Sequence, residues 1–287
     1  RTHLAIWIQD LWPESIAATG FIKNKLMLKV LGYLVRVIYS LSDTLLVQSK
    51  AFIGPVNAMS SHKKVMYFPN IMTDMKKSRD EVNNLLPAYL CDYLDNYFCF
   101  VFAGNIGKAQ SIETLISAAQ KLNDVPEVRI VIVGTGSMLN WAMQEVERRK
   151  MKNIIFTGSF PIDAMPPIFA KAKALLVLLA DQEIFSYTIP SKVQAYMSAG
   201  RPLIASINGE AARVIKEAKA GLTCPAEDYK SLATRIIEFF NMSEQERDII
   251  ADNGRRYFLE NFEMQRKCKD LIEILQKKIE IKKQEIK

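Results

Sequence analysis

The chain has 287 residues, which is long enough for about two domains and a sizeable core. Apolar residues make up 49% and charged residues 24%, as in a globular protein, and this composition excludes a disordered chain. With 38 Lys and Arg against 31 Asp and Glu, the net charge of +7 favours a polyanionic partner: a phosphorylated substrate, an anionic membrane surface or nucleic acid.

Four cysteines are scattered along the chain without a Cys-x-x-Cys pair, and only His3 and His62 could supply imidazole. This pattern predicts reduced core cysteines in a cytosolic protein rather than a zinc site. Lys29 and Arg36 interrupt the best apolar stretch, so none reaches the ~20 residues that span a bilayer. Because Arg1 leads at once into a strand, we expect that an N-terminal part is absent.

Short apolar runs alternate with amphipathic segments of helix length. Unbroken apolar strands in this arrangement predict a parallel sheet covered on both faces. The expected strands are Leu4–Ile8, Thr44–Val47, Val65–Phe68, Phe98–Phe102, Val128–Val133, Ile154–Phe156, Ala174–Leu179 and Leu203–Ala205. The expected helices include Ser111–Leu122, Ser137–Arg149, Asp163–Ala172 and Glu210–Ala220.

A polar segment without a strong period, Ile71–Asn96, places the domain boundary near residue 72. From Glu227 onward the pattern is helical, with an interruption expected at Asn253-Gly254. The last segment, Cys268–Lys287, is a helix whose five lysines after Gln276 form a solvated or membrane-facing basic edge.

The segment from Thr188 to Pro202 predicts a loop, a helix and the start of another strand. Pro190 suits a first helical turn, and Thr188 can cap the helix just ahead of it. Ser191 and Lys192 then lie at the helix N-terminus, whose free N–H groups suit an anion. Because Lys192 adds a full positive charge, this helix start predicts a site for a diphosphate.

Ligands of open parallel sheets bind beyond the carboxyl ends of the strands. Four loops of this chain fall there: Gly104–Gln110, Gly134–Ser137, Gly158–Pro161 and Asp181–Pro190. We therefore expect these loops to converge on one cleft.

Four motifs occur together: Ile-Gln-Asp-Leu-Trp-Pro-Glu-Ser (Ile8–Ser15), Ala-Gly-Asn-Ile-Gly-Lys-Ala-Gln (Ala103–Gln110), the Ile-Pro-Ser-Lys start of the helix, and Asn-Gly-Glu-Ala-Ala-Arg-Val-Ile (Asn208–Ile215). With them the chain resembles glycosyltransferase family 4, in particular enzymes of bacterial surface-polysaccharide synthesis. The resemblance implies the GT-B architecture, an α/β fold of two Rossmann-like domains that face each other across a cleft. Residues 1–71 would be the later part of the acceptor domain, 72–262 the complete donor domain and 263–287 a basic helix.

The resemblance implies a donor site formed by Gly104, Asn105, Gly107, Lys108, Gly134, Phe160, Thr188, Ser191, Lys192 and Glu210. The glycines let the backbone approach a phosphate closely, although an ordinary turn explains each of them as well. Phe160 either stacks on the base or packs against Met165.

The chain departs from the family pattern at four charged positions. Asn105 and Gln110 stand where many members carry an Arg and a Lys that grip the diphosphate. Compensation of its charge then falls chiefly to Lys192, helped by Lys108 or Arg201. The family's glutamate pair is also missing, since Ala195 and the region of Tyr187 occupy those places. Glu210 is either a substitute or a carboxylate that the helix dipole favours.

Catalytic roles are expected for Asp10, Glu14 and Lys192. Asp10 follows the first strand on the acceptor side, where it could orient the acceptor hydroxyl or accept its proton. Glu14 is a second candidate for this role, and both carboxylates could instead only shape the loop. The run Phe21–Leu41 is apolar and carries basic residues, which suits either an interfacial helix on an anionic leaflet or a core helix with a basic outer side.

The combined prediction is a glycosyltransferase in the cytoplasm, peripheral on the inner face of the cytoplasmic membrane. It would move a hexose or amino-deoxyhexose from a nucleotide diphosphate sugar, UDP-linked, to a lipid-linked saccharide for O-antigen, capsule or exopolysaccharide. The resemblance implies a retaining mechanism, no cofactor and no obligatory metal, and the chain carries no Asp-x-Asp pair. The alternatives are a GT-B nucleotide-sugar epimerase and a non-catalytic nucleotide-binding or scaffold subunit. Nucleic acid is not expected as a partner.

Overall fold

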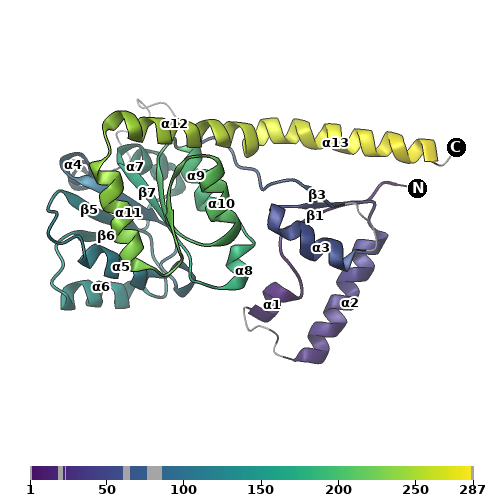
Figure 1. The fold of residues 1–287 in the computed structure, drawn as a ribbon, viewed down its shortest axis with the longest axis horizontal. Coiled ribbons are helices and arrows are strands. Elements are labelled where there is room, and N and C mark those ends of the chain that lie inside the picture. The colour runs from purple at the N-terminus through teal and green to yellow at the C-terminus, as the bar shows by residue number, and fades with distance from the viewer. Residues whose placement is uncertain (1, 19–21, 23, 61–64, 76–85, 286–287) are drawn as a thin grey trace.

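The computed structural model describes residues 2–18, 22, 24–60, 65–75 and 86–285 (Figure 1). For residue 18 and residues 282–285 it describes the backbone alone. Part of the predicted basic edge of the last helix, Lys23 of the basic apolar run and residues 76–85 of the polar segment therefore lie outside the described side chains.

The larger part of the molecule is built on a six-stranded parallel sheet with the order β6-β5-β4-β7-β8-β9. The strands are β4 (Phe98–Ala103), β5 (Val128–Val133), β6 (Ile154–Gly158), β7 (Ala174–Leu178), β8 (Leu203–Ser206) and β9 (Gly221–Cys224). This C-terminal unit confirms the predicted parallel sheet, and five of its six strands were expected.

Helices cover both faces of this sheet (Figure 1). They are α4 (Ala88–Asn96), α5 (Ile112–Gln120), α6 (Leu139–Arg148), α7 (Met165–Lys171), α8 (Glu183–Ser186), α9 (Ser191–Ser198), α10 (Gly209–Glu217), α11 (Tyr229–Asn241) and α12 (Glu244–Asn261), with 3-10 turns at Lys108–Gln110 and Ile162–Ala164. Alternate residues of β4 face opposite layers: Phe100 and Phe102 enter the core that contains α5 and α11, and Val101 and Ala103 enter the one that contains α9.

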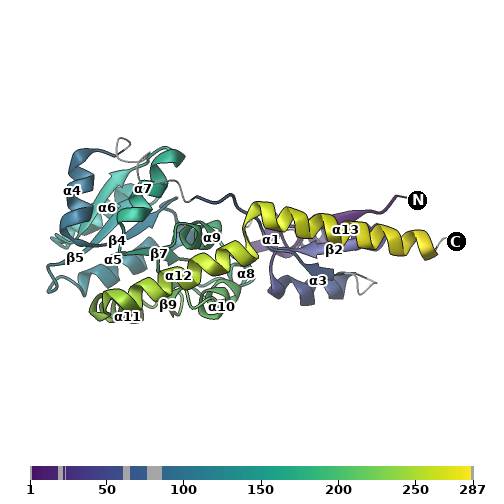
Figure 2. The ribbon, with the colours of Figure 1, turned by 90° about the horizontal axis from the view of Figure 1, so that it is seen from above.

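The N-terminal unit is a smaller sheet of three parallel strands, β1 (Ala5–Ile8), β2 (Thr44–Val47) and β3 (Val65–Tyr67), in that order. Its helices are α1 (Glu14–Ala18), α2 (Lys25–Leu41) and α3 (Ile53–Met59), and a 3-10 turn, Lys50–Phe52, follows β2. The last helix, α13 (Met264–Glu285), lies along this sheet on the side opposite α3 (Figures 1 and 2).

The chain crosses between the two units at two adjacent places. Met72 donates its N–H to Phe262 O at 3.0 Å, and Met264 N–H returns to Met72 O at 3.1 Å. The outgoing and returning segments therefore form a small two-stranded connection between the units.

The expected helix interruption at Asn253-Gly254 is wrong, because α12 runs unbroken from Glu244 to Asn261. A Cβ at Gly254 would lie 3.0 Å from the Ala220 Cβ and 3.6 Å from the Met197 Cγ. The glycine therefore serves close packing of α12 on its neighbours, and the helix ends instead at Phe262.

The strand that the sequence did not predict is β9. It has only four residues and begins with Gly221, which weakens the strand signal. A side chain at Gly221 would collide with the backbone of Leu203 on β8, so close strand approach explains this glycine.

Candidate functional site

The strand order of the large sheet reverses between β4 and β7. These two strands pair at Phe100 with Ala174 and at Val101 with Leu175, and not at their carboxyl ends. Such a switch point is where open α/β sheets bind their ligands. The loops after β4 and β7 meet there, with Ala180 N–H donated to Ala109 O at 2.9 Å.

The loops after β4 and β5 lie backbone against backbone. Gly104 N–H donates to Val133 O and Ile106 N–H to Thr135 O, both at 2.8 Å. Gly104 has φ +135° and Gly134 has φ +138°, and a Cβ at Gly134 would collide with Gly104 O. The glycines of both loops are thus required by their contact and by their backbone conformation.

Lys192 places its amine at the switch point. Its Nζ lies 3.9 Å from the centroid of the Phe102 ring, which favours a cation. The amine is buried and has no hydrogen-bond partner in the described part of the chain. Burial lowers the pKa of this lysine to about 8, so the site holds a cation without a counter-ion.

The loop after β4 passes directly over this lysine. An ideal Cβ at Gly104 would stand 2.6 Å from the Lys192 Cε and 2.8 Å from its Nζ. A residue with a side chain at position 104 would therefore displace the amine. The structure brings Gly104, Gly134 and Lys192 together, as the sequence predicted.

The start of α9 differs from the prediction in one respect. Pro190 is the N-cap residue, and no side chain caps the helix. The Thr188 hydroxyl donates instead to Phe185 O at 3.4 Å, so its predicted capping role is wrong. Ser191, exposed, begins the helix, and its first turn keeps the backbone geometry that suits an anion.

Two polar side chains of the loop after β4 face outward, whereas Ile106 of the same loop is buried. Asn105 and Lys108 are exposed, and the Asn105 amide donates to the Gln110 Oε1 at 3.3 Å. Gly107 lies between these two side chains, where a Cβ would be 2.7 Å from the Asn105 Nδ2. Ser111 is the N-cap residue of α5 but makes no side-chain capping bond, and its hydroxyl pairs with the Thr114 hydroxyl at 2.8 Å.

Two further predicted residues, Phe160 and Arg201, make their described contacts with other parts of the C-terminal unit. Phe160 is half-buried against the core that contains Met165, in agreement with the packing alternative. Arg201, named as a possible helper of Lys192, donates to the Ala170 carbonyl at the end of α7.

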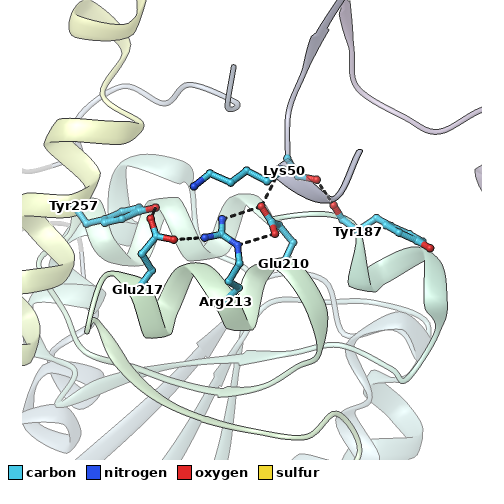
Figure 3. Close-up of polar contacts among 7 residues, drawn as sticks. Lys50, Tyr187, Glu210, Arg213, Glu217 and Tyr257 are labelled. Atoms are coloured by element: carbon cyan, nitrogen blue, oxygen red, sulfur yellow. Dashed lines mark hydrogen bonds and ion pairs between the residues drawn. The ribbon is translucent and has the colours of Figure 1, made fainter. Parts of the chain in front are cut away.

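Glu210 connects the two units (Figure 3). Its carboxylate is 5% exposed and accepts two hydrogen bonds from Arg213 and one from the Lys50 N–H, all at 2.9 Å. Burial would raise the pKa of Glu210, but the hydrogen bonds from Arg213 and Lys50 outweigh it and lower the pKa. Arg213 also pairs with Glu217, which accepts from the Tyr257 hydroxyl at 3.2 Å.

Asp10 and Glu14 lie on the N-terminal side of the same region. Both side chains are exposed, Asp10 after β1 and Glu14 at the start of α1. The pKa of Tyr187 is raised by its hydrogen bond to Glu183 and, less strongly, by the charge of Glu14. The helix that Glu14 begins, α1, lies against α8.

A chain of hydrogen bonds between amide groups joins the two units, and the sequence did not predict it. Gln48 donates to the Gln9 carbonyl and accepts from the Asn70 amide at 2.8 Å. The main-chain carbonyl of Asn70 in turn accepts from the side-chain amide of Gln194 on α9 at 2.8 Å. Next to Gln48, the Ser49 hydroxyl donates to Tyr187 O at 2.5 Å. Only the fold brings these polar residues together, although Gln194 lies on the predicted site helix.

Among the described residues, no group of three or more His, Cys, Asp and Glu side chains is placed to hold a metal ion. No helix within the described ranges is long and apolar enough to cross a membrane.

Known proteins match both the sequence and the fold. The family described as "Glycosyl transferases group 1" matches residues 98–242, from β4 to the end of α11. The chain belongs to this family. This group 1 glycosyl transferase chain is 23% identical over 264 residues to the probable glycosyltransferase WbjE of Pseudomonas aeruginosa. That match covers 89% of the chain but 66% of WbjE, so the chain spans slightly less than two thirds of this relative.

A second relative is the O-antigen chain mannosyltransferase C of Escherichia coli, 27% identical over 170 residues that cover 58% of the group 1 chain and 43% of the relative. Among solved structures, Anabaena Alr3699/HepE in complex with UDP matches with a TM-score of 0.78 and 15% identity. It covers 96% of the group 1 chain, which covers 73% of that structure. The likeness confirms the predicted GT-B fold of two Rossmann-like units.

Proposed function

We propose that this chain carries the donor-binding site of a glycosyltransferase for bacterial surface polysaccharide, with a nucleotide diphosphate sugar, UDP-linked, as the donor. Family membership supports the transfer, and the names of WbjE and the O-antigen mannosyltransferase support the polysaccharide. The UDP in the HepE structure supports the base. The proposed acceptor is a lipid-linked saccharide, and the proposed mechanism retains the anomeric configuration without a cofactor or an obligatory metal.

The observation that carries the proposal is the buried, unpaired amine of Lys192 at the switch point. A buried cation without a counter-ion gains from a bound anion, because folding has already removed most of the water around it. As the sugar leaves, charge builds up on the diphosphate, and a fixed cation stabilises that charge without reorganisation.

The proposed donor site comprises the residues predicted from the sequence, with Gly104, Gly134 and Lys192 at its centre. Asn105, Gly107, Lys108, Phe160, Thr188 and Ser191 line the adjoining loops, and Glu210 remains a candidate although it has partners of its own. Asp10 and Glu14 are proposed to act on the acceptor hydroxyl from the N-terminal side.

The proposed membrane contact rests on α2. Its buried side chains are Val35 and Tyr39, and eight large apolar side chains face outward: Leu26, Met27, Val30, Tyr33, Leu34, Val37, Ile38 and Leu41. Arg36 is nine residues from Met27, or two and a half turns at 3.6 residues per turn, so these two side chains point in opposite directions. We therefore propose that apolar burial, more than attraction to anionic lipid, holds this helix at a bilayer.

Calorimetric titration with UDP, GDP and ADP tests the donor site. We expect preferential binding of UDP that weakens at least tenfold, about 1.4 kcal/mol, in Lys192→Met. The control is Lys152→Met, an exposed lysine just before β6 and so at the opposite end of the sheet. Failure of a folded wild-type chain to bind any nucleotide would overturn the proposal and favour the scaffold alternative.

Flotation with lipid vesicles tests the membrane contact. Wild-type chain is expected to float with neutral and with anionic vesicles, and Val37→Glu is expected to reduce the floated fraction severalfold. Equal flotation of wild type and variant would exclude the α2 surface as the contact.

A further inference from the structure

Tyr196 makes two hydrogen bonds to one backbone residue at the candidate site. Its hydroxyl accepts from the Ala103 N–H at 3.2 Å and donates to the Ala103 carbonyl at 3.1 Å. The side chain is 1% exposed, and its ring meets Phe169 edge-on, with centroids 5.2 Å apart. Burial raises the pKa of this phenol, so the hydroxyl stays protonated and able to donate.

These bonds replace a missing strand contact. In a strand, the N–H and C=O of one residue point to the same side, and those of the next residue point to the opposite side. Gly104 N–H turns to Val133 on β5, so the polar groups of Ala103 turn toward β7. The pairing of β4 with β7 does not extend this far, and these groups would otherwise be buried without partners. A hydroxyl, which can both donate and accept, satisfies both of them.

The same face of α9 carries Lys192. Residues four apart on a helix are neighbours, so Lys192 and Tyr196 approach the end of β4 together. Tyr196 binds Ala103, while Lys192 lies over Phe102 and under Gly104. One face of α9 therefore positions both the Lys192 amine and the loop backbone that covers this amine.

We infer that Tyr196 is a positioning residue for the donor loop: its hydroxyl holds Ala103, and with it the Gly104 turn, in register with Lys192. The hydroxyl acts through the backbone and does not touch the donor. The role of the loop in donor binding rests on the proposed function, but the hold on the loop does not.

The first experiment needs no ligand. Hydrogen exchange in Tyr196→Phe, which keeps the ring, is expected to be at least tenfold faster in residues 103–107 and unchanged relative to wild type in β5. The control is Tyr93→Phe on α4, a half-buried tyrosine whose loss leaves the switch point intact. Unchanged exchange in residues 103–107 overturns the inference.

The second experiment measures UDP affinity in the same variants. We expect at least tenfold weaker binding in Tyr196→Phe, and wild-type binding in Tyr93→Phe. Phe169→Leu disturbs the same core but keeps the hydroxyl, so binding close to wild type is expected. If Phe169→Leu weakens binding as much as Tyr196→Phe, the role is packing alone and the inference fails.

The two experiments separate this inference from the proposed function. If wild type binds no nucleotide, the proposed function fails, while the exchange rates still decide the hold on the loop. The wild-type protein also gives a result if Tyr196→Phe does not fold. Its NMR spectrum should show a slowly exchanging hydroxyl proton close to the Ala103 N–H, and the absence of this proton overturns the inference.

Discussion

At the scale of single residues, Lys192 shows a conflict between stability and binding. Its amine is buried and has no hydrogen-bond partner among the described residues, which costs folding free energy, whereas a bound anion would remove this cost. A group of this kind is a candidate functional residue, because its buried charge does not stabilise the folded state.

Lys192→Met is expected to stabilise the free protein at neutral pH by on the order of 3 kcal/mol, from a pKa lowered from 10.5 to about 8. The folded protein binds fewer protons than the unfolded chain between these two pH values. The cost is therefore complete below about pH 8 and disappears as the pH rises toward 10.5. Urea unfolding of both proteins from pH 7 to 10.5 measures this difference.

A difference between variant and wild type that does not shrink above pH 8 would contradict the buried cation. The affinity of wild type for UDP should fall over the same pH range, because the free amine loses its proton. Lys152→Met is expected to match the stability of wild type at each pH and to lose UDP affinity over the same range as wild type, because it keeps Lys192.

At the scale of elements, two glycines inside helices have opposite reasons to be there. Gly254 in α12 lies against Ala220, and Gly54 in α3 has nothing within 4 Å of its ideal Cβ. In the sequence both positions hold a residue that weakens a helix. Only their surroundings in the structure show that one glycine is needed for packing and the other is not.

Gly254→Ala is expected to destabilise the protein by about 1–3 kcal/mol, since the added methyl group overpacks the contact with Ala220 and Met197. Gly54→Ala is expected to stabilise it by about 0.4–1 kcal/mol, because it only restricts the unfolded chain. Thermal unfolding of the two variants provides the comparison. Stabilisation by both substitutions would show that α12 has room for a side chain.

At the scale of the whole molecule, partly buried polar contacts join the two units within the described residues. Glu210 holds the Lys50 N–H, Ser49 holds Tyr187, and Gln48, Asn70 and Gln194 form the amide chain. The segment Gln48–Lys50 after β2 therefore contacts both α10 and the residue that ends α8 in the C-terminal unit.

Glu210→Ala is expected to cost about 2 kcal/mol, because the Lys50 N–H loses its acceptor and Arg213 keeps only its pair with Glu217. With a lowered pKa, Glu210 contributes stability above its ordinary pKa, and this contribution is lost as the pH falls through the folded value. Urea unfolding should thus show a smaller difference from wild type in acid than at pH 7. The control, Glu238→Ala, removes an exposed pair with Arg235 and should cost less than about 1 kcal/mol.

Loss of these contacts should also change the molecule's dimensions. The double variant Ser49→Ala/Glu210→Ala is expected to have a larger radius of gyration in X-ray scattering than wild type. An unchanged radius would mean that the crossings at Met72 and Phe262 hold the units together by themselves.

The sequence by itself determined the fold class and brought three residues of the candidate site to one edge of the sheet. Apolar runs of strand length lie between amphipathic helices, and this alternation is a local property that survives without knowledge of contacts. Gly104, Gly134 and Lys192 could be placed at one edge because every strand of a parallel sheet ends there. The family motifs added the second unit and the cleft.

Only the tertiary structure decided the roles that depend on neighbours distant in sequence. The sequence alone shows Tyr196 as an apolar residue of a helix. The structure shows that β4 and β7 diverge before Ala103, so the Tyr196 hydroxyl supplies the hydrogen bonds that Ala103 would otherwise lack. The sequence alone explains Glu210 as a carboxylate that the helix dipole favours. The structure adds the hydrogen bond that Glu210 accepts from the Lys50 N–H of the other unit. The sequence alone predicts a helix interruption at Gly254. The structure shows that Gly254 lies against Ala220 within an unbroken helix. In each case the deciding group lies far along the chain, and folding alone brings the two together.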